Sequence, residues 1–219
     1  MTAASRDRAE GGVTQLIVMA KAPVPGRVKT RLCPPYTPAQ AARLAAAALA
    51  DTLAAGDAAP VAARIVAVHG PYAAPAGWQA LRQRGRGLGS RLANAYRDTA
   101  RPGVATLLIG MDTPQVTPDL LRQAVSALAA PGVDAVLGPA EDGGWWALGL
   151  NDPVHARVLA QVPMSTPRTG VETAGALSAR GLRVAPLPVL RDVDTAEDAR
   201  AVVRQCRPQS RFLQAMAAG

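Results

Sequence analysis

The sequence predicts an α/β protein in which a mostly parallel sheet is covered by helices on both faces. Two observations lead to this fold class. Short apolar runs rich in β-branched residues recur along the 219 residues, and segments with helical periodicity separate them. Such runs are typical of strands buried on both faces, and their alternation with helices is typical of parallel sheets.

The expected elements follow one another in regular order. Strands are expected at residues 14–19, 64–68, 105–109, 135–137, 146–150 and 182–185. Helices are expected at residues 37–55, 90–99, 117–129, 153–161, 171–180 and from 195 onward. Thr37 and Thr117 are each followed by proline, a combination that begins many helices. Because no repeat or linker interrupts this order, we expect one domain over residues 13–219 after a disordered leader over residues 1–12.

The charge of the chain does not by itself indicate nucleic-acid binding. The formal net charge is +8 and the pI is about 10.7, which would attract phosphate. The basic residues are nearly all arginine, however, and they are scattered along the chain. Aromatic residues, on which unpaired bases stack, make up only 3% of the chain and are not interleaved with the basic ones. We therefore expect no nucleic-acid partner.

The cysteines and the N-terminal residues bear on compartment. Cys33 and Cys206 are the only cysteines and form no CxxC pair, so a zinc site is not expected. Residues 1–12 are polar and lack the apolar segment of a signal peptide. No apolar run approaches the roughly 18 residues that a membrane-spanning helix needs. We therefore expect a cytoplasmic protein with reduced thiols and no membrane partner.

Ligands of open α/β sheets bind at the carboxyl ends of the strands, so the residues after each strand are the candidates for function. The first such segment, residues 20–35, carries four basic residues in a loop stiffened by proline and glycine: Lys21, Arg27, Lys29 and Arg31. Cations gathered there favour a phosphate site, although a solvated turn would look the same. The loop is not a Walker A motif, because Val28 stands where glycine would precede Lys-Thr.

A carboxylate follows the strand expected at residues 105–109. Asp112 lies in the segment GMDTP. Asp112 could cap a helix, but Thr117 is the better cap since Pro118 follows it. Asp112 is then free to bind Mg²⁺ or Mn²⁺, ions that prefer oxygen ligands.

The third segment combines two carboxylates, two glycines and two tryptophans. It runs from Gly138 to Trp146 and contains Glu141, Asp142, Gly143, Gly144 and Trp145. Adjacent glycines let a backbone approach a ligand closely, although a tight turn followed by core tryptophans is an equally simple explanation. Because side chains alternate along a strand, only one of the tryptophans can face the ligand side.

The fourth segment, DVDTAED, precedes the last expected helix. Thr195 and Asp198 resemble a capping box, which leaves Asp192 and Asp194 without a structural role. Two residues apart on an extended segment, these carboxylates point to the same side and can hold a cation together with Asp112. A solvated turn before the helix is the alternative.

Taken in order, KAPVPGRVKTRL, GMDTP, GPAEDGGWWALGL and DVDTAED resemble the bacterial rSAM/selenodomain-associated transferase 1 family, also called arsenosugar-biosynthesis glycosyltransferases. The resemblance spans about Val13 to Arg204. It implies the Rossmann-like GT-A fold of nucleotide-diphospho-sugar transferases. Lys29-Thr30-Arg31-Leu32 and Asp192-Val193-Asp194-Thr195 are also similar to 2-phospholactate guanylyltransferases.

This resemblance implies a role for each candidate residue. The implied metal ligands are Asp112, Asp192 and Asp194, with Mg²⁺ or Mn²⁺ as cofactor. The implied nucleotide- and phosphate-binding residues are Lys21, Lys29, Arg31, Gly143 and Gly144, and the implied catalytic residues are Asp112, Asp142 and Lys29. The segment from Glu141 to Gly144 would line the acceptor or sugar side.

The implied partners are a nucleotide or nucleotide-sugar and a small-molecule acceptor. Glycosyl transfer would expel a nucleoside diphosphate from a sugar, whereas nucleotidyl transfer would expel pyrophosphate from a nucleoside triphosphate. The whole-chain resemblance favours glycosyl transfer. Gly110 stands where typical GT-A glycosyltransferases carry the first aspartate of Asp-x-Asp, which favours nucleotidyl transfer. A catalytically silent nucleotide-binding protein is a third interpretation, and the full carboxylate set argues against it.

Overall fold

The computed structural model describes residues 13–218, and the leader expected at residues 1–12 lies outside them. The strands are β1 (Thr14–Lys21), β2 (Ala63–His69), β3 (Gln79–Arg82), β4 (Ala105–Gly110), β5 (Ala135–Pro139), β6 (Trp145–Leu150) and β7 (Val184–Pro186). Within the described residues they form one seven-stranded sheet of order β3-β2-β1-β4-β6-β5-β7. All neighbours are parallel except β6, which runs antiparallel to both β4 and β5. The expected mostly parallel sheet is confirmed.

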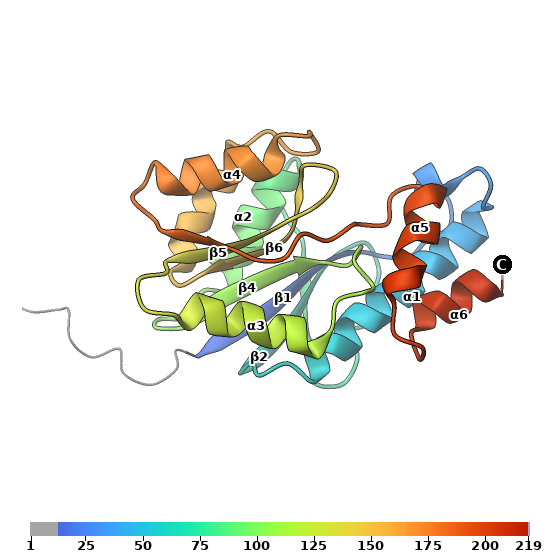
Figure 1. Cartoon of the computed structure of the whole chain (residues 1–219), viewed down its shortest axis with the longest axis horizontal. Helices are drawn as coiled ribbons and strands as arrows, with labels where there is room; N and C mark the ends of the chain where they lie inside the picture. The colour runs from blue at the N-terminus through green and yellow to red at the C-terminus, as the bar shows by residue number, and fades with distance from the viewer. Residues whose placement is uncertain (1–12, 219) are drawn as a thin grey trace, which may run out of the picture.

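Helices cover both faces of this sheet (Figure 1). They are α1 (Pro38–Asp57), α2 (Leu88–Thr99), α3 (Pro118–Ala129), α4 (Thr169–Ser178), α5 (Ala196–Val202) and α6 (Arg211–Ala217), with 3-10 helices η1 (Thr30–Leu32), η2 (Pro153–Ala160) and η3 (Val203–Gln205). Leu16 and Val18 of β1 pack with α1 and α3, whereas Ile17 and Met19 pack with α2, η2 and α4. The alternation of side chains along one strand thus supplies both apolar layers.

A third apolar cluster joins the loop after β1 and α1 to the C-terminal helices. Leu32 of η1, Val193, Phe212 of α6 and residues of α1 and α5 bury one another. Asp51 of α1 accepts hydrogen bonds from Ser210 Oγ and from the backbone N–H groups of Arg211 and Phe212, at 2.6 to 2.9 Å. Figure 1 shows α5 and α6 gathered against α1 at one end of the molecule. This cluster holds the segment before α5 beside the loop after β1.

The starts of α1, α3 and α5 were predicted correctly, whereas α2 and α4 begin two residues earlier than expected and some other elements were missed. The side chains of Thr37, Thr117 and Thr195 each accept a hydrogen bond from the first turn of α1, α3 and α5. Strand β3 and helix α6 were missed, and the helix expected at 153–161 is the 3-10 helix η2. β3 lies at the edge of the sheet and is mostly exposed, so it lacks the apolar run that marked the other strands.

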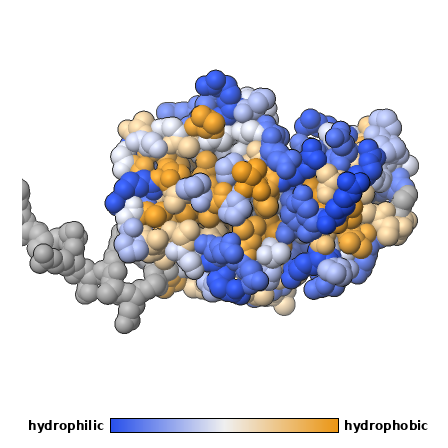
Figure 2. Space-filling model, viewed as in Figure 1, coloured by the Kyte–Doolittle hydropathy of each residue, from blue (hydrophilic) through white to orange (hydrophobic). Residues whose placement is uncertain are grey.

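One face of the molecule is divided by polarity. Figure 2 shows hydrophilic residues over the end formed by α5 and hydrophobic residues gathered between α3 and α4. None of the helices within residues 13–218 combines the length and apolar character that crossing a membrane requires.

Candidate functional site

A cleft of about 980 Å³ opens at the carboxyl ends of β1 and β4. Its walls come from the loop after β1, the residues after β4, the turn between β5 and β6, the loop before α4 and the segment before α5. Nearly all the segments singled out in the sequence therefore meet at one place. The cleft lies where parallel α/β sheets bind their ligands.

The loop after β1 places its cations unequally. Lys21 and Arg31 line the cleft and are exposed, whereas Arg27 is exposed and does not line it. Lys29 adopts a left-handed backbone conformation, with φ of 47° and ψ of 42°, directly before η1. Its neighbours Val28 and Leu32 are buried and anchor the loop on either side. The side chain of Lys29 is thereby turned into the cleft, where it is only 10% exposed.

The ammonium group of Lys29 lies between two carboxylates. Its Nζ atom is 2.8 Å from Asp112 Oδ1 and 2.9 Å from Asp194 Oδ1. Burial lowers the pKa of Lys29, but Asp112 and Asp194 outweigh this effect, so its pKa is raised and the group is charged. Arg31 Nη1 contacts the other oxygen of Asp194 at 2.9 Å. Asp112 and Asp194, predicted from separate segments, are thus brought together.

Hydrogen bonds to backbone groups hold together the two segments that carry these carboxylates. The N–H of Val193 donates to the carbonyl oxygen of Asp112 at 2.9 Å, and Gln115 Nε2 donates to the carbonyl oxygen of Arg191 at 2.6 Å. Val193 itself is buried in the cluster under α5 and α6. The segment that carries Asp194 is therefore held against the residues that follow β4.

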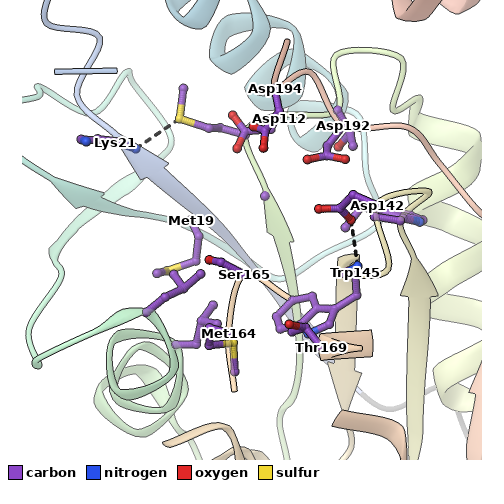
Figure 3. Close-up of a pocket in the computed structure, with 18 of the residues that line it drawn as sticks. Met19, Lys21, Asp112, Asp142, Trp145, Met164, Ser165, Thr169, Asp192 and Asp194 are labelled. Carbon is purple, nitrogen blue, oxygen red and sulfur yellow. Dashed lines mark hydrogen bonds between the residues drawn. The ribbon is translucent and has the colours of Figure 1, made fainter. Parts of the chain in front are cut away.

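Asp192 faces a different neighbour. Figure 3 shows the aspartates in sequence along the cleft, with Asp194 and Asp112 together, Asp192 next and Asp142 beyond it. The pKa of Asp192 is raised to about 6, first by burial and then by the negative charges of Asp142 and Asp194. This part of the cleft therefore carries more negative than positive charge and would favour an added cation.

The three predicted metal ligands do not form a ready-made cage. Within residues 13–218 no three His, Cys, Asp or Glu side chains lie close enough together to hold a metal ion. The reason is local: Lys29 stands between Asp112 and Asp194, and Asp192 lies toward Asp142. Two carboxylates still suit a divalent ion, because Mg²⁺ commonly binds through one or two carboxylates together with substrate phosphates.

The two glycines of the third segment serve packing as well as the cleft. A side chain on Gly143, whose φ is +86°, would come within 2.0 Å of the carbonyl oxygen of Pro167. Gly144 lines the cleft, and its N–H donates to Asp142 Oδ1 at 2.8 Å. The sequence suggested that a ligand approaches the backbone of these glycines. In the structure, residues 167–170 of the protein itself make part of this close approach.

The tryptophans lie on opposite faces of β6, as their spacing predicted. Trp146 is 2% exposed, and its Nε1 donates to the carbonyl oxygen of Pro188 at 2.9 Å. Trp145 lies in the cleft with Met19 and Met164 (Figure 3). The cleft thus has a charged end at the aspartates and a largely apolar end at Trp145.

Several cleft residues were given no role in the sequence analysis, among them the loop before α4, Arg191 and Gln83. Arg191 Nε contacts Glu141 Oε2 at 3.1 Å and Asp198 Oδ1 at 3.2 Å, so Glu141 is paired within the protein. Gln83 follows the missed strand β3 and donates through Nε2 to the carbonyl oxygens of Ala20 and Ala67, both at 2.8 Å. These two bonds use both hydrogens of the Gln83 amide, so its side chain can bind a ligand only through the acceptor Oε1. Correct prediction of β3 would have identified Gln83 as a residue at a carboxyl end.

The sequence of residues 38–166 matches the model of a family described as uncharacterized proteins conserved in bacteria, DUF2064. The chain belongs to this family. No curated protein matches the chain in sequence. The DUF2064 match includes α1, β4, Asp112, the glycine pair and Trp145, and it ends before Asp192 and Asp194.

Solved structures share the fold of this DUF2064 protein. A proposed nucleotide-diphospho-sugar transferase from Desulfovibrio desulfuricans G20 superposes with a TM-score of 0.84 at 24% identity, over 94% of each chain. Rv0371c from Mycobacterium tuberculosis H37Rv, in complex with manganese, gives a TM-score of 0.55 at 23% identity, over 87% of this chain and 98% of that one. CMP:2-keto-3-deoxy-manno-octonic acid synthetase, in complex with CTP, gives 0.55 at 14% identity, over 94% and 99%. The expected Rossmann-like transferase fold is confirmed; a fold does not fix an activity.

Proposed function

We propose that this DUF2064 protein is a nucleotide-using transferase that depends on a divalent metal, and that it transfers a sugar from a nucleotide-diphospho-sugar. One observation carries the proposal. Cations of the loop after β1 and carboxylates from the ends of β4 and the segment before α5 meet in one cleft at the carboxyl ends of the strands. The fold shared with the Desulfovibrio protein supports the sugar donor. The four motifs support membership in the rSAM/selenodomain-associated transferase branch.

The basic residues would hold the phosphates of the donor. Lys21 and Arg31 are exposed in the cleft and can reach an incoming diphosphate, and Lys29 adds a third cation. Asp112 and Asp194 would hold Mg²⁺ or Mn²⁺ jointly with those phosphates. When bound, the metal neutralises the charge that develops on the leaving phosphate.

The acceptor would lie at the end of the cleft that Trp145 lines. Asp142 stands between this apolar end and the other aspartates (Figure 3). One of its oxygens accepts the N–H of Gly144, which orients the carboxylate and leaves the second oxygen available. We assign Asp142 the removal of a proton from the acceptor hydroxyl, for which a positioned carboxylate is suited.

Nucleotidyl transfer is the second candidate, and one observation favours it. Strand β4 ends at Gly110 and is followed by Met111 and Asp112, so a single carboxylate stands where an Asp-x-Asp pair would supply two. In this reaction the same cleft would bind a nucleoside triphosphate, and a phosphorylated metabolite would attack its α-phosphate.

The leaving group distinguishes the two reactions. The purified protein is incubated with Mg²⁺ or Mn²⁺ and either sugar nucleotides or nucleoside triphosphates plus phosphorylated metabolites, and products are separated by anion-exchange chromatography. Release of nucleoside diphosphate supports glycosyl transfer, whereas release of pyrophosphate supports nucleotidyl transfer and reverses our order.

Thermal stability supplies a test that needs no acceptor. A nucleotide at about one hundred times its dissociation constant adds roughly 2.7 kcal/mol of stability. We expect this increase with metal present and its loss in Asp112→Asn. Asp119→Asn is the matched control, since Asp119 is 75% exposed, lies in the first turn of α3 and does not line the cleft. If no nucleotide raises the melting temperature with either metal, the proposed function is wrong.

A further inference from the structure

A side chain of the protein lies between Asp112 and Asp194, the two carboxylates that would hold a metal under the proposed function. Lys29 Nζ contacts one oxygen of each carboxylate, at 2.8 and 2.9 Å. A divalent ion bridging the same oxygens would have to stand where this ammonium group stands. We propose that Lys29 and the metal are alternative occupants of this position, so that metal binding releases Lys29 to the phosphates of the nucleotide. The proposal rests on the metal-dependent function proposed above.

Three features show that the contact of Lys29 with Asp112 and Asp194 is part of the folded structure and differs from an exposed surface ion pair. Its side chain is only 10% exposed, and its left-handed backbone is fixed between buried Val28 and Leu32. A left-handed backbone is unfavourable for a residue other than glycine, so the tertiary structure has to hold it there. Among residues 13–218 its ammonium group has no partner other than these two aspartates.

The backbone segments that carry the two aspartates are held together. The hydrogen bond from Val193 N–H to the carbonyl oxygen of Asp112 joins the two segments next to the carboxylates. Val193 is 2% exposed, and its side chain is packed against α1, α5 and α6. A metal ion that binds the carboxylate oxygens contacted by Lys29 would therefore compete with its ammonium group at this position.

This competition links the metal to the nucleotide. A metal ion that arrives alone must separate Lys29 from both carboxylates and leave a poorly solvated ammonium group without a partner. A nucleotide offers phosphate oxygens to the displaced ammonium group, so metal and nucleotide should each strengthen the binding of the other by the same factor. Lys29 is then the residue through which this coupling acts.

The decisive measurement is the affinity for Mn²⁺ without nucleotide, by isothermal titration calorimetry or by the electron paramagnetic resonance signal of free Mn²⁺. Lys29→Met should bind Mn²⁺ about tenfold more tightly than wild type, because the competing charge-assisted contacts are gone. Lys21→Met is the matched control. It removes the same charge from the same cleft, but Lys21 has no contact with Asp112 or Asp194. Its Mn²⁺ affinity should stay within about threefold of wild type, since charges farther apart are screened by salt.

A second arm measures the coupling itself. A non-hydrolysable nucleoside triphosphate should raise the Mn²⁺ affinity of wild type by a larger factor than that of Lys29→Met. Circular dichroism and melting temperature establish that each variant is folded, and Lys29→Gln replaces Lys29→Met if the latter does not fold.

The outcomes separate this inference from the function on which it rests. Equal Mn²⁺ affinity in wild type and Lys29→Met, or an equal gain on adding nucleotide in wild type and Lys29→Met, overturns the exchange and leaves the metal-dependent transferase standing. Failure of the wild-type protein to bind Mn²⁺, with nucleotide as well as without it, overturns both.

Discussion

Replacement of Gly143 by alanine tests how the cleft wall is built. The backbone of Gly143 has φ of +86°, and an added Cβ atom would lie 2.0 Å from the carbonyl oxygen and 2.5 Å from the carbonyl carbon of Pro167. The obstacle is backbone, so it cannot rotate away as a flexible side chain would. The N–H of Gly170 also donates to the carbonyl oxygen of Gly143 at 2.8 Å, and a shift would strain this bond.

Gly77→Ala supplies the matched control for the magnitude. Gly77 has nearly the same φ, +82°, and nothing lies within 4 Å of its added Cβ atom. Both variants carry the left-handed penalty of about 1 to 2 kcal/mol, and both gain the same 0.4 to 1 kcal/mol from a less flexible unfolded chain. The difference between them therefore measures the contact with Pro167. Forced overpacking costs about 1 to 3 kcal/mol, and the strained hydrogen bond adds about 1 kcal/mol.

We therefore expect Gly143→Ala to lower the free energy of unfolding by about 2 to 4 kcal/mol more than Gly77→Ala does. Urea unfolding followed by circular dichroism measures both values. Nucleotide binding should also weaken in Gly143→Ala, since Pro167 and Thr169 line the cleft. Two variants of equal stability, within about 0.5 kcal/mol, would show that the approach of residues 167–170 to Gly143 is not as described.

Three further predictions concern the stability of the fold, its dependence on pH and nucleic-acid binding. Asp51→Ala should cost about 3 kcal/mol in urea unfolding, because the start of α6 loses the three hydrogen bonds that its carboxylate accepts, and a change below about 1 kcal/mol would contradict this. The hydrogen bond from Arg84 lowers the pKa of Asp98, so this pair stabilises the fold above the ordinary aspartate range. That stability should be lost as pH falls through the lowered pKa, and Asp98→Asn should melt with less dependence on pH below about 4 than wild type does. We expect DNA or RNA binding, measured by fluorescence anisotropy, to be weak, indifferent to sequence and lost between about 50 and 200 mM salt. Tight binding at the higher salt would contradict the prediction, made from the scattered arginines, that the protein has no nucleic-acid partner.

Local patterns in the sequence were sufficient for most of the secondary structure. The apolar runs of β1, β4 and β6 identified buried strands, because burial on both faces leaves few polar positions in a strand. A threonine followed by a proline identified the starts of α1 and α3. This signal is local because the threonine side chain accepts a hydrogen bond from the first turn of its own helix. Strand β3 and helix α6 were not predicted, because contacts with distant parts of the chain, and not local sequence patterns, hold them in place. β3 is an exposed edge strand, and α6 is held by Asp51, which is 161 positions away from Phe212.

The sequence by itself determined most of the segments that reach the cleft, because the order of strands and helices places the residue after each parallel strand at one edge of the sheet. It also determined that one tryptophan faces the core and the other the cleft. Only the tertiary structure decided which charges meet there. Lys29 and Asp194 are 165 positions apart, and their contact depends on the backbone of Lys29 and on the packing of Val193 under α5 and α6. From the sequence, Asp112, Asp192 and Asp194 were equivalent candidates for one metal site. In the structure Lys29 contacts Asp112 and Asp194, and Asp192 lies toward Asp142. Contacts between distant segments decide these pairings, and they cannot be read from local sequence.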